Sequence, residues 1–186
     1  MPGRLMSVFL AVFSSPARAY QLIKEPGISA RFFSLAYGMP LLMAASVGRM
    51  FTVEVPGGGI LQSLFVALSN MIAYATAVLA GSYLVAKLAA PFQSKSDRPL
   101  AMKLILLSFT PFFLALAAHA LIPRVRYLGL AALVYTVFLF GKGLQALFET
   151  PSPKVAGFTF ISFFILLGIA WVINLLVSGL LIYSPQ

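Results

Sequence analysis

Long apolar runs, separated by short polar segments, dominate this chain. A helix needs about 20 mainly apolar residues to cross roughly 30 Å of hydrocarbon, and five runs have that length. They extend approximately over residues 31–51, 60–90, 99–122, 125–148 and 157–183. Sequences rich in turn residues separate them, namely "VPGGG", "PFQSKSDRP", "IPRV" and "ETPSPK". The pattern predicts an all-α integral membrane protein with five transmembrane helices.

The beginning of the chain follows a different pattern. Polar or small residues recur there at alternating steps of three and four, which is the spacing of one helix face. They are Arg4, Ser7, Ala11, Ser14, Arg18, Gln21 and Glu25. We predict that residues 1–28 form an amphipathic interfacial segment before a transmembrane domain over residues 29–186. Pro16 is expected to divide this segment into two short helices, with Ser14 or Ser15 capping the second.

Residues 4–20 also have the outline of a cleavable secretory signal. An arginine and an apolar run precede Ala17-Arg18-Ala19, which has the small residues of a cleavage site. Cleavage there would require Lys24 and Arg31 to be translocated, contrary to the preference of basic residues for the cytoplasm. We therefore interpret the segment as a retained, membrane-surface helix.

The composition supports a membrane protein. Hydrophobic residues make up 61% of the 186 residues and charged residues 9%, whereas soluble domains usually carry about 25% charged residues. The mean hydropathy is +0.99. Thirteen Lys and Arg against four Asp and Glu give a net charge of +9. We attribute this charge to cytoplasmic loops, which collect Lys and Arg, and predict no nucleic-acid partner.

The basic residues divide unevenly between the two sides of the predicted bundle. One side and its flanks hold ten: Arg4, Arg18, Lys24, Arg31, Lys87, Lys95, Arg98, Lys103, Lys142 and Lys154. The other side holds three: Arg49, Arg124 and Arg126. This asymmetry predicts a cytoplasmic amino terminus and, after five spans, a carboxyl terminus outside.

Anionic membrane lipids are the partner that this charge predicts. The basic residues of the amino-terminal segment and its junction with the first span would lie among lipid headgroups: Arg4, Arg18, Lys24 and Arg31. Each such residue contributes about 1 kcal/mol near an anionic surface.

Residues for catalysis or metal binding are sparse. The chain has no cysteine, one histidine and four acids, whereas a zinc site needs three or four such ligands. A Ser-His-Asp relay would need His119, yet Asp97 lies 22 residues away, about 30 Å along a helix. Glu54 lies on the same side as His119 and leaves that pairing open. We predict no metal, no cofactor and no enzymatic activity.

Polar residues inside the spans are candidate contacts for a lipid or substrate, because they cost free energy in hydrocarbon. Lys142 is about 9 Å from the cytoplasmic end of the fourth span. Its ammonium could reach the headgroups or line a cavity, and Gly141 and Gly143 beside it allow close approach. Asn70 and Asn174 lie about 15 Å deep in their spans. They could hydrogen-bond to each other or bind a substrate.

Two prolines fall near the middle of spans. Pro40 and Pro111 each remove a backbone hydrogen bond and are expected to kink the helix. Such breaks occur in ordinary packed helices and also line the substrate sites of transporters. A small transporter or lipid-handling protein with a cavity near Lys142 is therefore one hypothesis, with these candidate lining residues: Pro40, Asn70, Pro111, Lys142 and Asn174.

Three segments resemble the Yip domain family, the Rab/Ypt-interacting type of five-span membrane protein. They are "FSSPARAYQLIKEP" (Phe13 to Pro26), "SFTPFFLA" (Ser108 to Ala115) and "LFETPSPKVAGFT" (Leu147 to Thr159). The chain is most similar to the short bacterial members, which implies a multi-pass protein of the cytoplasmic (inner) membrane. Eukaryotic relatives bind prenylated Rab GTPases, help to shape membranes and have cytosolic amino termini. The resemblance implies no catalytic residue.

The leading hypothesis is a non-enzymatic inner-membrane protein that acts as a binding, scaffolding or membrane-organising module. Its partners would be anionic lipids and another membrane protein or a second copy of itself. Small residues on one side of the second span offer a close-packing surface for another span or another chain: Ala73, Ala77, Ala80 and Gly81.

Overall fold

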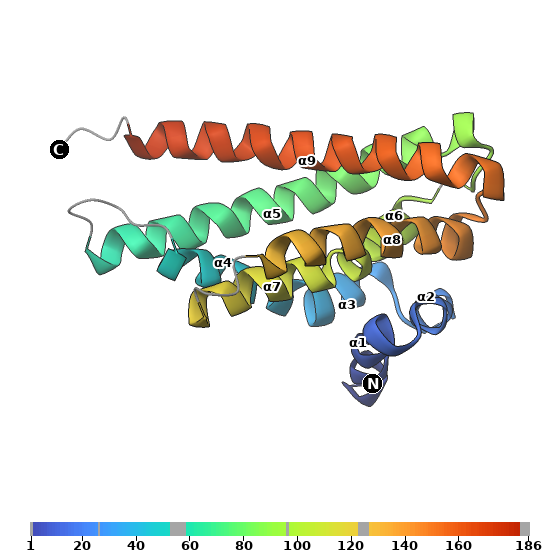
Figure 1. The fold of residues 1–186 in the computed structure, drawn as a ribbon, viewed down its shortest axis with the longest axis horizontal. Coiled ribbons are helices and arrows are strands. Elements are labelled where there is room, and N and C mark those ends of the chain that lie inside the picture. Colours follow the sequence, from blue (N-terminus) through green and yellow to red (C-terminus); the bar gives the residue numbers. More distant parts are fainter. Residues whose placement is uncertain (1, 26, 53–58, 96, 123–126, 183–186) are drawn as a thin grey trace.

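The structure is a computed structural model that describes residues 2–25, 27–52, 59–95, 97–122 and 127–182. These residues form helices joined by short connections (Figure 1). In chain order they are α1 (Pro2–Ser14), α2 (Pro16–Lys24), α3 (Ala30–Phe33), the π-helical η1 (Ser34–Gly38), α4 (Met39–Thr52), α5 (Ile60–Leu88), the 3-10 turn η2 (Ala90–Phe92), α6 (Arg98–Ser108), α7 (Thr110–Leu121), α8 (Leu128–Phe148) and α9 (Ser152–Ile182).

Five helical segments are long and apolar enough to cross a membrane. They are Ala30–Phe51, Ile60–Leu88, Arg98–His119, Leu128–Phe148 and Ser152–Leu176. The all-α, five-span prediction is therefore confirmed. The fifth helix begins at Ser152, five residues earlier than predicted, because Pro153 lies in its first turn, where proline needs no hydrogen-bond donor.

The spans run side by side along the long axis of the molecule, with α9 and α5 along one edge and α7 and α8 on the other side (Figure 1). The third span is the most buried of the five, and within it Leu104, Leu106 and Leu107 are almost fully enclosed. Gly81 of α5 packs against Leu166 of α9, where an added Cβ would lie 2.2 Å from Leu166 Cδ2. At Gly81, the predicted small-residue surface of α5 thus meets another span of the same chain.

Proline interrupts the helices in two different ways. Pro111 breaks the third span, because α6 ends at Ser108 and α7 begins at Thr110, with Phe109 between them at φ −83° and ψ 0°. Pro40 follows the π-helical segment η1, in which the Met39 amide donates to the Ser34 carbonyl. This wider turn accommodates a proline that lacks an amide proton.

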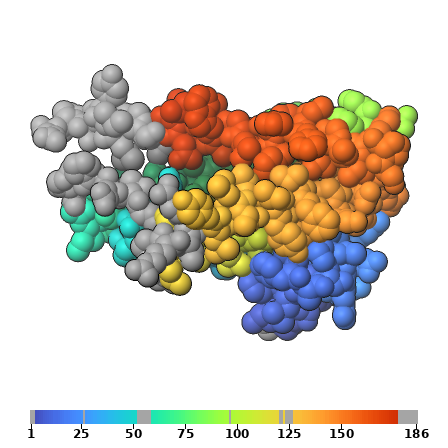
Figure 2. All heavy atoms as spheres, viewed as in Figure 1, coloured from blue at the N-terminus to red at the C-terminus, as the bar shows by residue number. Residues whose placement is uncertain are grey.

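The helix pair α1–α2 lies against one side of the bundle, near the end that carries the α5–α6 and α8–α9 connections (Figures 1 and 2). Pro16 divides the pair, as predicted, and occupies the first position of α2. The predicted side-chain cap is wrong: Ser15 holds the N-cap position without a cap hydrogen bond, and the Ser14 hydroxyl donates to the Leu10 carbonyl instead.

Candidate functional site

Tyr20 attaches α2 to the bundle. Its side chain is fully buried, and its hydroxyl lies 2.8 Å from Ser108 Oγ and donates to the Leu139 carbonyl at 2.9 Å. Gly143 of α8 makes room for the ring, since a Cβ there would lie 2.7 Å from Tyr20 Cε1. Burial in this site raises the pKa of the Tyr20 phenol, so the hydroxyl stays protonated. Tyr20 thereby connects α2 to both α6 and α8.

Lys103 makes a second connection from inside the bundle. It is buried in α6, and its ammonium donates to the Ile23 carbonyl at the end of α2 at 2.8 Å. A buried cation is costly without partners, so this contact requires α2 to be in place. From the sequence Lys103 was only one basic residue among ten on the cytoplasmic flank, and its proximity to α2 carries no local sequence signal.

Glu149 forms a third connection in the turn between α8 and α9. Its carboxylate accepts from Lys24 of α2 at 3.0 Å and from Lys95 after η2 at 2.7 Å. Hydrogen bonds from Lys95 and Lys24 hold the pKa of the Glu149 carboxyl below its ordinary value. Beside it, the Thr150 hydroxyl lies 2.9 Å from Ser94 Oγ and donates to the Leu144 carbonyl.

The basic residues predicted for the membrane surface fall into two groups. Arg18 and Arg31 are exposed. Arg4 and Lys24 form ion pairs within the protein, Arg4 with Glu25 and Lys24 with Glu149. Contact of any of the four with lipid stays a prediction.

Helix α1 is apolar on two faces. Val8, Ala11 and Val12 are buried, and the Tyr135 hydroxyl of α8 donates to the Val12 carbonyl at 2.9 Å. Ala11, which the sequence pattern had grouped with the polar face, therefore packs inward. The outward face carries a row of large side chains that are 61%, 60% and 49% exposed, namely Met6, Leu10 and Phe13. We call this row the α1 ridge.

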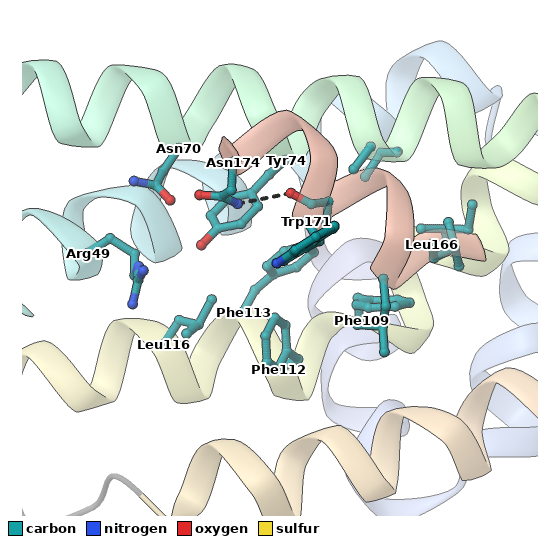
Figure 3. Close-up of a pocket in the computed structure, with 15 residues that line it drawn as sticks. Arg49, Asn70, Tyr74, Phe109, Phe112, Phe113, Leu116, Leu166, Trp171 and Asn174 are labelled. Carbon is teal, nitrogen blue, oxygen red and sulfur yellow. Dashed lines mark hydrogen bonds between the residues drawn. The ribbon is translucent and has the colours of Figure 1, made fainter. Parts of the chain in front are cut away.

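A pocket of about 480 Å³ lies among α4, α5, α7 and α9, toward the end of the bundle where α5 begins (Figures 1 and 3). Polar groups from three spans line one end of it: Arg49, Asn70 and Asn174. Aromatic and aliphatic side chains line the rest, among them Phe109 and Leu166. In the sequence, Arg49 indicates only the orientation of the chain, whereas the structure places it in the same pocket as the two predicted asparagines.

The predicted hydrogen bond between Asn70 and Asn174 is absent from the described contacts. Asn70 Nδ2 donates to the Val66 carbonyl at 2.8 Å, and Asn174 Nδ2 donates to the Ala170 carbonyl at 3.1 Å, each one turn back in its own helix. Asn70 Oδ1 is buried and has no partner among the described residues. Sequence spacing had placed both amides at the same depth, and the structure places both in one pocket.

The other intramembrane candidates lie elsewhere. Lys142 is exposed in a shallow hollow of about 390 Å³ between α8 and α9, with its ammonium 5.7 Å from the centre of the Phe138 ring. Pro111 lines a third hollow beside α1, and Pro40 is on the exposed surface. The three hollows share no lining residue, so the five candidates do not form the one cavity that the transporter hypothesis requires.

Metal-binding residues stay apart in the described ranges, where no three of His, Cys, Asp and Glu come together. His119 lies near the end of the third span, and its buried Nδ1 atom has no partner among the described residues. Its suggested partner Glu54, together with Arg124 and Arg126, lies outside the described residues.

Five apolar spans with polar groups held between them define a multi-pass α-helical membrane protein. The chain belongs to the Yip1 domain family, because the model of that domain matches residues 10–175. This match extends from α1 into α9 and confirms the resemblance of the three quoted segments. Comparisons with curated proteins and with solved structures find no match.

Proposed function

We propose that this protein is a non-enzymatic membrane-organising module of a bacterial inner membrane, which binds anionic lipid on the cytoplasmic side through the pair α1–α2. The α1 ridge is the observation that carries the proposal. Three large apolar side chains in a row, exposed on a helix whose other face is docked, are typical of a helix that inserts into one leaflet. Full burial of such a side chain from water contributes about 1.5–3 kcal/mol, and since each of the three is about half exposed, insertion would contribute roughly half of that per residue.

Firm attachment to the bundle supports this role. Tyr20, Lys103 and Tyr135 each hydrogen-bond across the boundary between the helix pair and the spans. An inserted ridge is therefore held at a fixed depth in the membrane and on a fixed side of the spans. Because it displaces lipid in one leaflet only, it favours local bending or sorting of lipids around the protein.

Positive charge gives the helix pair α1–α2 its preference for anionic lipids. Arg18 of α2 and Arg31 of α3 are exposed near the same end of the bundle. Exposed cations near an anionic leaflet are attracted within about a Debye length. The apolar ridge supplies insertion, and these cations supply selectivity for phosphatidylglycerol-type headgroups.

The test uses the full chain, which has no cysteine of its own, in phosphatidylcholine vesicles with and without phosphatidylglycerol. An environment-sensitive dye is attached to Leu10→Cys or, as the matched control, to Gln21→Cys on the exposed face of α2. We expect blue-shifted emission only at Leu10, because only the ridge enters hydrocarbon. Spin-labelled phosphatidylglycerol should quench it more than spin-labelled phosphatidylcholine, and the double variant Arg18→Gln, Arg31→Gln should abolish that difference.

Organisation of the membrane is measured as vesicle diameter by electron cryomicroscopy at increasing protein content. We expect smaller vesicles with the native chain than with Met6→Ser, Leu10→Ser, Phe13→Ser. Water-like emission at Leu10, or vesicle sizes that are independent of the ridge, would contradict the proposal.

A further inference from the structure

The pocket among α4, α5, α7 and α9 has polar side chains at one end and apolar side chains at the other. Arg49, Asn70 and Asn174 lie toward one end, and Phe109 and Leu166 lie toward the other (Figure 3). A volume of about 480 Å³ falls in the range of small-molecule sites, roughly 300–1,000 Å³. Such a distribution suits an amphiphile with its head at the polar end.

Asn70 indicates what the head must offer. Its Nδ2 donates to the Val66 carbonyl, and because a carbonyl accepts only from the nitrogen, this bond determines which amide atom faces the pocket. The remaining atom, Oδ1, is an acceptor without a partner among the described residues, on a side chain only 7% exposed. An unsatisfied buried acceptor is costly, so a ligand that donates a hydroxyl hydrogen bond is favoured there.

Arg49 indicates the charge of the head. Its guanidinium lines the polar end and carries several N–H donors. A planar guanidinium matches the two oxygens of a phosphodiester. The polar end therefore combines an anion-binding group with an unsatisfied hydrogen-bond acceptor.

The apolar part has the properties of an acyl-chain site. Phe109, Phe113 and Leu166 line it, and Trp171 at its edge is 65% exposed. An exposed aromatic edge on a transmembrane helix faces the bilayer, so a chain can enter sideways from the lipid. The volume accommodates part of a lipid while the remainder stays in the bilayer.

We propose that this pocket binds one anionic glycerophospholipid with a hydroxyl-bearing head. The phosphodiester contacts Arg49, a head hydroxyl donates to Asn70 Oδ1, and one acyl chain lies along Phe109 and Leu166. This site is separate from the α1 ridge, and its lipid is held within the bundle.

Trp171 provides the measurement, because it is the only tryptophan of the chain. The full-length protein is reconstituted in phosphatidylcholine containing a small fraction of lipid with a brominated chain, which quenches tryptophan on contact. We expect brominated phosphatidylglycerol to quench at roughly tenfold lower fraction than brominated phosphatidylcholine, as one charge-assisted hydrogen bond allows. Brominated fatty acid should quench no better than brominated phosphatidylcholine.

Variants locate the effect. Arg49→Gln with Asn70→Leu should remove the preference for phosphatidylglycerol, and Ala77→Phe, which fills the pocket wall, should do the same. Thr76→Phe adds the same ring to the exposed face of α5 and should retain the preference. Serine substitutions in the α1 ridge should also retain it, which distinguishes this site from the proposed surface binding.

Equal quenching by the two phospholipids would overturn the proposal. So would a preference that survives both pocket variants, or stronger quenching by the fatty acid than by phosphatidylglycerol.

Discussion

Three elements approach one another closely at Gly143. An added Cβ would lie 2.2 Å from Leu104 Cδ1 of α6 and 2.7 Å from the Tyr20 ring of α2. Leu104 and Tyr20 are both fully buried, so neither can move away without opening the packed interior. Tyr20 can therefore make its hydrogen bonds, and α2 can dock, only because residue 143 has no side chain.

We predict that Gly143→Ala lowers the free energy of unfolding by about 1–3 kcal/mol, as overpacking does. The measurement is denaturant unfolding of the purified protein in detergent, with Gly168→Ala as the control. A Cβ added at Gly168 would have nothing within 4 Å, and alanine favours the helix by about 1 kcal/mol. Equal stability of the two variants would show that α2 does not pack against α8 as described.

The hydrogen bonds and ion pair that connect the helices come from the three segments that carry the family resemblance. Tyr20 comes from the first and bonds to Ser108 of the second. In the second segment, Thr110 also lies 2.8 Å from the hydroxyl of Tyr37. Glu149 comes from the third and pairs with Lys24 of the first. These segments therefore hold the helix pair and the broken third span together at one end of the bundle.

The Glu149 connection predicts a pH dependence. Because its ion pairs lower the pKa of the folded-state carboxyl, their contribution is complete above the ordinary value of 4.5 and is lost as the pH falls through the lower folded value. We expect the thermal midpoint of the native chain to decrease as the pH falls through that acidic window. The midpoint of Glu149→Gln should decrease less.

The matched control for this prediction is Arg18→Gln, which removes an exposed cation of α2 and should leave the pH dependence intact. Lys24→Gln with Lys95→Gln should reproduce the shallower pH profile of Glu149→Gln. A Glu149→Gln profile as steep as that of the native chain would disprove the role of the pair.

On the scale of the whole molecule, the two ends of the bundle differ. One end carries α1–α2, Glu149 and the exposed Arg18 and Arg31. The pocket with Arg49 lies in the other half, beside the end of α4 and the first half of α5. Basic residues at the first end predict that it faces the cytoplasm, which would place the two proposed lipid sites in opposite leaflets.

Orientation is tested with single cysteines and an impermeant maleimide. Ser152→Cys lies at the start of α9, and Gly59→Cys lies before α5 at the opposite end. We expect labelling of Gly59→Cys from outside intact spheroplasts and of Ser152→Cys only in inverted vesicles. The reverse pattern would invert the assignment of leaflets.

The sequence alone determined the number of spans, their approximate limits and the breaks at Pro16 and Pro111. These features follow from local chemistry, because hydrocarbon requires long apolar helices with internally bonded backbones and proline removes a donor wherever it occurs. The sequence also identifies the polar residues that cost free energy inside the membrane, such as Asn70, because their position in an apolar run is a local feature.

Only the tertiary structure decided what these residues contact. Asn70 and Asn174 share a depth, yet each amide bonds to a carbonyl of its own helix, because any carbonyl within reach satisfies a donor in an apolar medium. The inward face of α1 and the contact of Lys103 with Ile23 depend on which helices become neighbours. Helical periodicity identifies a face, whereas the packing of side chains from distant segments determines what that face meets.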